Sequence, residues 1–179
     1  MHIHAHGTGV TVLELMVTLA IAAILVTAGV PSFQHYLHRQ HVKAAVNQLH
    51  HDLMLARSEA VYRNAVVIAC PGAPDRGCAL GPDWSSGWIV FEDSDGDRTL
   101  SGDEAVIRHG QLLQTVRVET TSGRGPLRFF PDGSAPGTNM SISLCGRGGP
   151  PDARKLVVSN IGRIRRDTWP DLDASRCPT

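Results

Sequence analysis

The chain has 179 residues, which is enough for one ordinary domain and an appendage but too few for two domains with separate cores. Its 17 basic and 17 acidic side chains give a formal net charge of zero. A global electrostatic attraction to nucleic acid or to an acidic substrate is therefore excluded, and any electrostatic partner must bind a local patch.

Residues 12–30 form the first predicted element. This stretch is apolar apart from Glu14, Thr18 and Thr27, and its length suits a helix that crosses a bilayer. A cleaved secretory signal with a cut site near Ala28 is the alternative, and it would release a soluble periplasmic binding module. Glu14 favours the anchor, because a carboxylate in an apolar run is costly and would not be kept in a disposable segment without a use.

A second helical pattern follows Pro31, with apolar residues at steps of three and four and polar residues between them. The apolar positions are Val42, Ala45, Val46, Leu49, Leu53, Ala56 and Ala60, and the polar ones are Lys43, Gln48, Asp52, Glu59 and Arg63. We expect a single helix from about residue 11 to 63, on the order of 80 Å long. Its first half should face lipid and its second half a folded domain. Gly29 and Pro31 should kink it, because proline removes a backbone donor and clashes with the preceding turn.

The start of the apolar run resembles a known processing site. The sequence GVTVLE, residues 9–14, is similar to the class III cleavage motif of type IV prepilins, a glycine followed by Phe-Thr-Leu-x-Glu, with two valines in place of Phe and Leu. The resemblance implies that a prepilin peptidase cuts after Gly9 and methylates the amine of Val10. It also implies that Glu14 pairs with the terminal amine of a neighbouring subunit, a pairing that makes a carboxylate tolerable in lipid. The leader, residues 1–9, has histidines in place of Lys or Arg, which weakens its positive-inside signal.

After Asn64, a predicted helix stop, the pattern changes to short β-branched runs separated by Gly, Pro and Asp. The predicted strands are 65–70, 87–92, 105–108, 115–120, 127–130, 141–144, 155–159 and 163–166. Short strands at this spacing suggest antiparallel sheets packed on the amphipathic half of the helix. The predicted fold class is therefore α+β.

Four cysteines lie in the β-rich part. Cys70 and Cys78 flank a turn rich in Pro, Gly and Asp, and Cys145 and Cys177 lie late in the chain. An even count in this arrangement predicts two disulfides and hence an oxidising compartment. A zinc site of four thiolates is the alternative, although the sequence has no Cys-x-x-Cys pair.

The body resembles one protein family. The stretch from Cys70 to Cys78, the run WSSGWIVF at residues 84–91, the Asp-rich turn after it and the stretch from Leu144 onward are similar to the FimT/GspH family of minor pilins and pseudopilins. The resemblance spans nearly the whole chain and implies a pilin-like fold. It also implies a leader at 1–9, an inner-membrane helix at 10–30, an amphipathic helix at 31–64 and a disulfide-bonded domain at 65–179. That domain would lie in the periplasm, and after assembly in the extracellular pilus.

The C-terminal basic residues are a candidate DNA site. After a predicted turn at 160–162, Arg163 and Arg165 point to one side of an extended segment, about 7 Å apart, where they can meet successive phosphates. Residues 162–165 resemble the Gly-Arg-x-Arg motif of FimT-type minor pilins, which bind DNA for natural transformation. Residues expected to widen the patch are Arg147, Arg154, Lys155 and Arg166, and Trp169 could stack on a base. The alternative is an edge strand whose arginines discourage sheet-to-sheet association.

An acidic turn is a candidate cation site. Asp93, Asp95, Asp97 and Glu104 fall at positions one, three, five and twelve, which is the carboxylate spacing of a calcium loop. The glycine stands at position four rather than six, so an acidic hairpin turn fits as well. A second candidate metal site consists of His35, His38 and His41, spaced three apart.

Motifs of common enzyme classes are absent from the sequence, which has no His-Glu-x-x-His, no Gly-x-Ser-x-Gly and no phosphate-cradling loop. We therefore expect a protein that is not an enzyme and that needs no cofactor apart from the candidate calcium ion. With the family resemblance, the sequence favours a minor pilin of a type IV pilus that assembles with other pilins and binds double-stranded DNA for uptake. The alternative is a GspH-like pseudopilin of a type II secretion system with a purely structural role.

Overall fold

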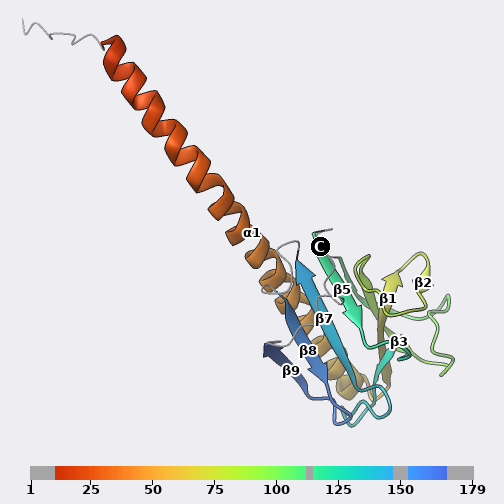
Figure 1. Cartoon of the computed structure of the whole chain (residues 1–179). Helices are drawn as coiled ribbons and strands as arrows, with labels where there is room; N and C mark the ends of the chain where they lie inside the picture. The colour runs from red at the N-terminus through yellow and green to blue at the C-terminus, as the bar shows by residue number, and fades with distance from the viewer. Residues whose placement is uncertain (1–10, 112–114, 147–152, 169–179) are drawn as a thin grey trace, which may run out of the picture. The chain divides into compact units, whose positions relative to one another are not determined.

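The structure, a computed structural model, describes residues 11–111, 115–146 and 153–168. These residues form one helix, α1 (Val12–Arg63), and nine strands, β1 to β9 (Figure 1). The chain divides into two compact units, Met1–Leu37 and His38–Thr179, and helix α1 contributes to both.

The first unit contains the apolar half of α1. Thr11 caps the helix, because its Oγ1 accepts a hydrogen bond from the backbone N–H of Glu14 at 3.2 Å. The large apolar side chains of this half are exposed, among them Leu13, Leu19 and Ile24. Helix α1 is the one helix in the described residues that is long and apolar enough to cross a membrane. Its backbone stays helical through Pro31, and the kink expected there stays a prediction.

The second unit contains the rest of α1, and the helical periodicity of the sequence predicted its buried face. All seven apolar positions are buried: Val42, Ala45, Val46, Leu49, Leu53, Ala56 and Ala60. They share one core cluster with side chains from both sheets, including Trp88, Phe129 and Leu144. The helix ends at Arg63 because Asn64 adopts a left-handed conformation (φ 52°), and the N–H of Ala65 turns back to the carbonyl of Ala60 at 3.2 Å.

The first sheet has five strands in antiparallel pairs. They are β1 (Val66–Ala73), β2 (Gly77–Cys78), β3 (Trp88–Asp93), β4 (Val106–Gly110) and β6 (Leu127–Phe129). The order is β2-β1-β3-β4, and β6 pairs with the N-terminal half of β1. A disulfide between Cys70 and Cys78 joins β1 to the short strand β2.

The second sheet has four antiparallel strands in the order β5-β7-β8-β9. They are β5 (Val116–Thr120), β7 (Met140–Gly146), β8 (Arg154–Val158) and β9 (Ile164–Thr168). Figure 1 shows β7, β8 and β9 side by side, with β9 at the end of the sheet. At the opposite end the edge of β5 is covered, because the N–H of Trp84 donates to the carbonyl of Val118 at 2.8 Å.

Each predicted strand overlaps an observed one, and the differences have local causes. Strand β1 runs three residues beyond the predicted end, because Pro71 and Gly72, normally turn residues, stay paired with neighbouring strands. Strand β2 was not predicted, since two residues give no periodic signal.

Candidate functional site

The Arg163 and Arg165 side chains lie on the solvent face at the end of the second sheet. Both are exposed, and Ile164 between them is buried with an exposed fraction of 8%. The register places Arg165 opposite Val157 of β8, and the carbonyl of Arg163 accepts a hydrogen bond from the N–H of Ser159 at 3.0 Å. The two arginines therefore point to one side, as the alternation of an extended chain requires.

The turn before these arginines is fixed by a second turn and by the helix. The N–H of Ala135 donates to the carbonyl of Asn160 at 2.7 Å, and Arg57 Nε of α1 donates to the carbonyl of Gly133 at 2.9 Å. Gly162 has φ 72°, and a Cβ at this position would overlap the carbonyl oxygen of Gly133. A residue other than glycine would therefore displace the strand that presents the arginines.

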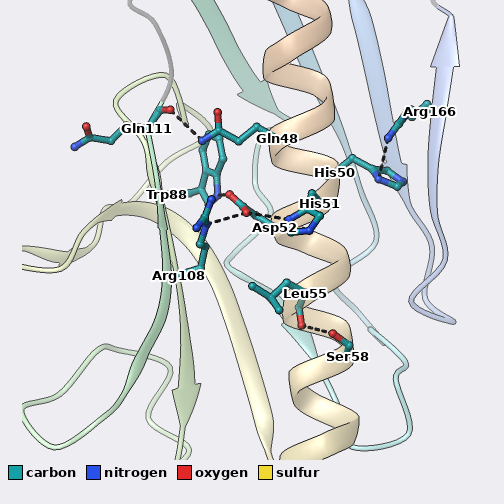
Figure 2. A network of polar contacts seen from close by, with 10 residues as sticks. All are labelled: Gln48, His50, His51, Asp52, Leu55, Ser58, Trp88, Arg108, Gln111 and Arg166. Atoms are coloured by element: carbon teal, nitrogen blue, oxygen red, sulfur yellow. Dashed lines mark hydrogen bonds and ion pairs between the residues drawn. The ribbon is translucent and has the colours of Figure 1, made fainter.

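Arg166 points to the other face of β9. It lies opposite Leu156, which is buried against the helix, and its Nη2 is 3.3 Å from Nδ1 of His50 on α1 (Figure 2). The pKa of His50 is lowered, first by partial burial and then by the charge of Arg166. A neutral His50 can accept the hydrogen bond that the guanidinium of Arg166 donates.

A groove of about 320 Å³ lies beside Arg166 on this face. It is lined by Lys43, Val46 and Asn47 of α1, Arg154 and Lys155 of β8, and Arg166 and Asp167 of β9. The basic residues predicted as one DNA patch therefore form two groups. Arg163 and Arg165 face solvent, whereas Arg154, Lys155 and Arg166 line the groove. Arg147 and Trp169 lie outside the described residues.

The acidic turn joins β3 to β4, and its carboxylates gather. Ligand oxygens of Asp93, Asp95 and Asp97 lie within 4.8 Å of one another. Oδ1 of Asp93 accepts hydrogen bonds from the N–H groups of Gly96 at 3.1 Å and Arg98 at 3.3 Å, so Asp93 also closes the turn.

Glu104 has a different local role. Its two carboxylate oxygens accept the backbone N–H groups of Ser94 at 2.8 Å and Ser101 at 3.0 Å. The calcium site at Asp93, Asp95, Asp97 and Glu104 stays a prediction. So does the histidine site, of which His38 and His41 lie edge to face with ring centroids 6.4 Å apart.

Asp52 was predicted to be one of the polar residues outside the apolar stripe of the helix, and this is wrong. Its side chain is 1% exposed. Oδ2 of Asp52 accepts a hydrogen bond from Nε1 of Trp88 at 3.0 Å, and Oδ1 accepts one from Nε of Arg108 at 3.0 Å (Figure 2). The helical spacing could have revealed the burial of Asp52, because this residue lies three positions after Leu49 and four before Ala56, and both of these are buried.

The processing and disulfide predictions fall partly on described residues. Glu14 is exposed in the first turn of α1, whereas Gly9 and Val10 lie outside the described residues. Cys70 bonds Cys78, as the disulfide prediction requires, and Cys145 is disulfide-bonded as well, so the zinc alternative is wrong for these three thiols. Cys177 lies outside the described residues.

A long helix, apolar at its N-terminal end and packed on antiparallel sheets further along, defines a pilin-like protein. Residues 45–162 match the protein family described as type II transport protein GspH, so the chain belongs to the GspH family. This result and the fold confirm the resemblance to minor pilins and pseudopilins noted in the sequence. Pilins and pseudopilins are structural proteins, in agreement with the prediction that the chain is not an enzyme.

Individual relatives agree with this family. The pilin-like protein PilA1 of Thermus thermophilus is 28% identical over 163 residues, which cover 88% of this chain and 96% of that protein. The type IV minor pilin FimU of Pseudomonas aeruginosa shares the fold with a TM-score of 0.56 at 21% identity, over 80% of this chain and 96% of FimU. The minor pseudopilin EpsH of the Vibrio cholerae type 2 secretion system gives 0.52 at 12% identity, over 72% of this chain and 97% of EpsH.

Proposed function

We propose that this chain is a minor pilin of a type IV pilus that binds extracellular DNA through Arg163 and Arg165 for uptake in natural transformation. The observation that best supports this proposal is the exposed pair of guanidinium groups on one side of an edge strand. A turn that requires glycine holds this strand in place. Guanidinium groups bind phosphate oxygens with two parallel hydrogen bonds, and an array on a rigid support binds without much loss of conformational entropy. Binding of this kind is independent of sequence and strongly dependent on salt.

Assembly is the other half of the proposal. A prepilin peptidase cuts after Gly9 and methylates Val10, the apolar half of α1 anchors the protein in the inner membrane, and Glu14 pairs with the N-terminal amine of a neighbouring pilin. The exposed apolar side chains of residues 12–30 support the anchor. The disulfides support a periplasmic position for the folded unit, because such bonds persist in oxidising compartments.

A structural pseudopilin of a type II secretion system is the second candidate. The match to the GspH family and the fold shared with EpsH favour it. The two candidates differ at β9, because a purely structural subunit has no need of paired arginines on the solvent face, except to protect a sheet edge.

Fluorescence anisotropy with a short labelled DNA duplex tests the DNA half of the proposal. The full chain in non-ionic detergent micelles is titrated at two salt concentrations, beside the variant Arg163→Ala/Arg165→Ala. Loss of two phosphate contacts should weaken binding and reduce the slope of log K against log salt by about 1.8.

The matched control is Arg76→Ala/Arg124→Ala, which removes the same charge from two exposed positions elsewhere on the unit. It should bind nearly as tightly as the unchanged chain. If the unchanged chain does not bind, or if both double variants lose affinity equally, the DNA half of the proposal is wrong and the structural pseudopilin is the better description.

A further inference from the structure

Charges on the folded second unit are segregated, although the chain as a whole is neutral. The groove between α1 and the end of the second sheet gathers Lys43, Arg154, Lys155 and Arg166, and Asp167 is the acidic residue among its described lining residues. The loop between β3 and β4 has the opposite character, because Asp95, Asp97 and Asp103 are exposed there and outnumber its one exposed cation, Arg98. A positive recess and a negative projection therefore exist on one folded unit.

The groove is lined by the kinds of side chain that bind a carboxylate. Lys43 and Arg166 come from the helix and from the edge strand, so cations approach the recess from two sides. Contact with Nδ1 of His50 at 3.3 Å positions the guanidinium of Arg166, which lowers the entropy lost when that group binds an anion. Val46 contributes apolar surface and Asn47 an amide that can donate a hydrogen bond.

The β3–β4 loop provides carboxylates of the kind that the groove would bind. The exposed carboxylates of Asp95 and Asp97 lie within 4.8 Å of each other and of the buried carboxylate of Asp93, so the negative charge is concentrated. Backbone N–H groups hold the loop in shape, since Asp97 donates to Oδ1 of Asp95 at 3.0 Å and Thr99 donates to Oδ1 of Asp97 at 2.7 Å. A preorganised acidic loop loses little conformational freedom on docking.

Figure 1 shows the β3–β4 loop, in yellow-green, on the side of this unit away from β9. The loop of one chain therefore does not reach the groove of the same chain. We propose that the groove binds the β3–β4 loop of a second copy of this chain. The contact joins two different patches, so it is heterologous and propagates head to tail, which is the arrangement that generates open helical filaments.

This contact adds to the assembly half of the proposed function but is independent of Glu14 and of DNA. One loop in one groove buries less surface than a stable complex needs, so the contact is weak in dilute solution and gains strength when subunits are held together by their membrane helices. Its strength should also fall with added salt, because exposed charges attract one another over roughly 10 Å at moderate ionic strength.

Zero-length cross-linking of isotope-mixed protein tests the contact. Equal amounts of unlabelled and ¹⁵N-labelled full chain are mixed in non-ionic detergent and treated with a carbodiimide, which joins lysine amines directly to carboxylates. We expect Lys43 to be joined to Asp95, Asp97 or Asp103, in peptide pairs that contain one labelled and one unlabelled partner. The yield should fall several-fold in high salt.

Charge reversal makes the test specific. Lys43→Glu/Arg166→Glu and Asp95→Lys/Asp97→Lys should each abolish the mixed pairs when used alone, and a mixture of the two variants should restore them with the charges exchanged. The matched control Arg76→Glu/Arg124→Glu changes the charge by the same amount elsewhere and should leave the yield unchanged. A misfolded variant would not be rescued by its complement.

Four outcomes would overturn the inference. Pairs found only within one isotopic form would place the contact inside one chain. An absence of pairs at Lys43, or pairs that both reversals leave intact, would mean that the groove does not bind the loop. If mixed pairs are absent and DNA alone protects Lys43 from the reagent, the groove is part of the DNA surface. None of these outcomes alters the anisotropy test of Arg163 and Arg165.

Discussion

The indole N–H of Trp88 donates a hydrogen bond to Oδ2 of Asp52 at 3.0 Å, and this contact joins α1 to the first sheet inside the core. Nε of Arg108, on the neighbouring strand β4, donates to the other carboxylate oxygen at 3.0 Å. A buried carboxylate is stable only when donors or cations satisfy it, and here both oxygens are satisfied. The cluster therefore fixes the position of the helix on β3 and β4.

Asp52→Ala should destabilise the second unit by about 1 to 3 kcal/mol, because the indole N–H of Trp88 loses its acceptor in a buried place. Arg108→Ala should cost less, on the order of 1 kcal/mol or below, because Arg108 is half-exposed and water can replace it. Urea unfolding followed by tryptophan fluorescence gives both values. Equal losses in the two variants would show that the ion pair, rather than the indole hydrogen bond, dominates.

Gly162→Ala should destabilise the unit and weaken DNA binding although every arginine is retained, because the new Cβ overlaps the carbonyl oxygen of Gly133. Gly137→Ala is the matched control, since Gly137 has a similar φ of 70° but open space around it. The control should lose about 1 kcal/mol from backbone strain alone. Urea unfolding and anisotropy measure the two effects, and an identical loss in both variants would mean that the contact with Gly133 is unimportant.

Cys70→Ala/Cys78→Ala should lower the free energy of unfolding by about 2 to 3 kcal/mol, because the short loop between β1 and β2 gains freedom in the unfolded chain. Cys70 is also buried, so the lost sulfur adds a small packing term. Unfolding of the variant and of the unchanged chain is compared without reductant. A change below about 1 kcal/mol would show that the native bond gives little net stabilisation.

Acidification should weaken the contact between α1 and β9. The pKa of His50 is lowered in the folded protein, by burial first and by Arg166 second, so the unfolded chain binds the proton more readily. Stability from this group is fully present above the ordinary histidine pKa of about 6.5, and it is lost as the pH falls from that value through the lower pKa of the folded state.

The variant His50→Gln isolates this effect from the other histidines, because glutamine does not titrate and can still accept a hydrogen bond from Arg166. Free energies of unfolding are measured at several pH values between 5 and 8 for both proteins. The unchanged chain should lose more stability on acidification than the variant does. Parallel curves would show that His50 does not contribute.

The sequence predicted the helix and the strand positions well, because both follow periodicities that burial imposes on the chain. The seven apolar residues from Val42 to Ala60 alternate at helical spacing and are all buried, and Ile164 is buried between two exposed arginines as a strand requires. The groove and the Asp52 cluster were not predicted. They join α1 to strands at least 30 residues away in sequence, and local periodicity contains no information on which strand meets which helical face.

Glu14→Val should leave the second unit folded and block incorporation into filaments, because the apolar side chain cannot pair with the N-terminal amine of a neighbouring subunit. Glu14→Gln is the closer control for shape. It should also fail to enter filaments, since an amide keeps the hydrogen bond but not the charge. Thr11→Ala separates helix capping from assembly, because Thr11 Oγ1 accepts the N–H of residue 14 whatever its side chain is. Sheared filaments are assayed for each variant, beside the membrane fraction. Normal incorporation of Glu14→Val would remove the proposed role of Glu14. If Thr11→Ala alone fails to enter filaments, incorporation depends on the capped helix end rather than on the carboxylate.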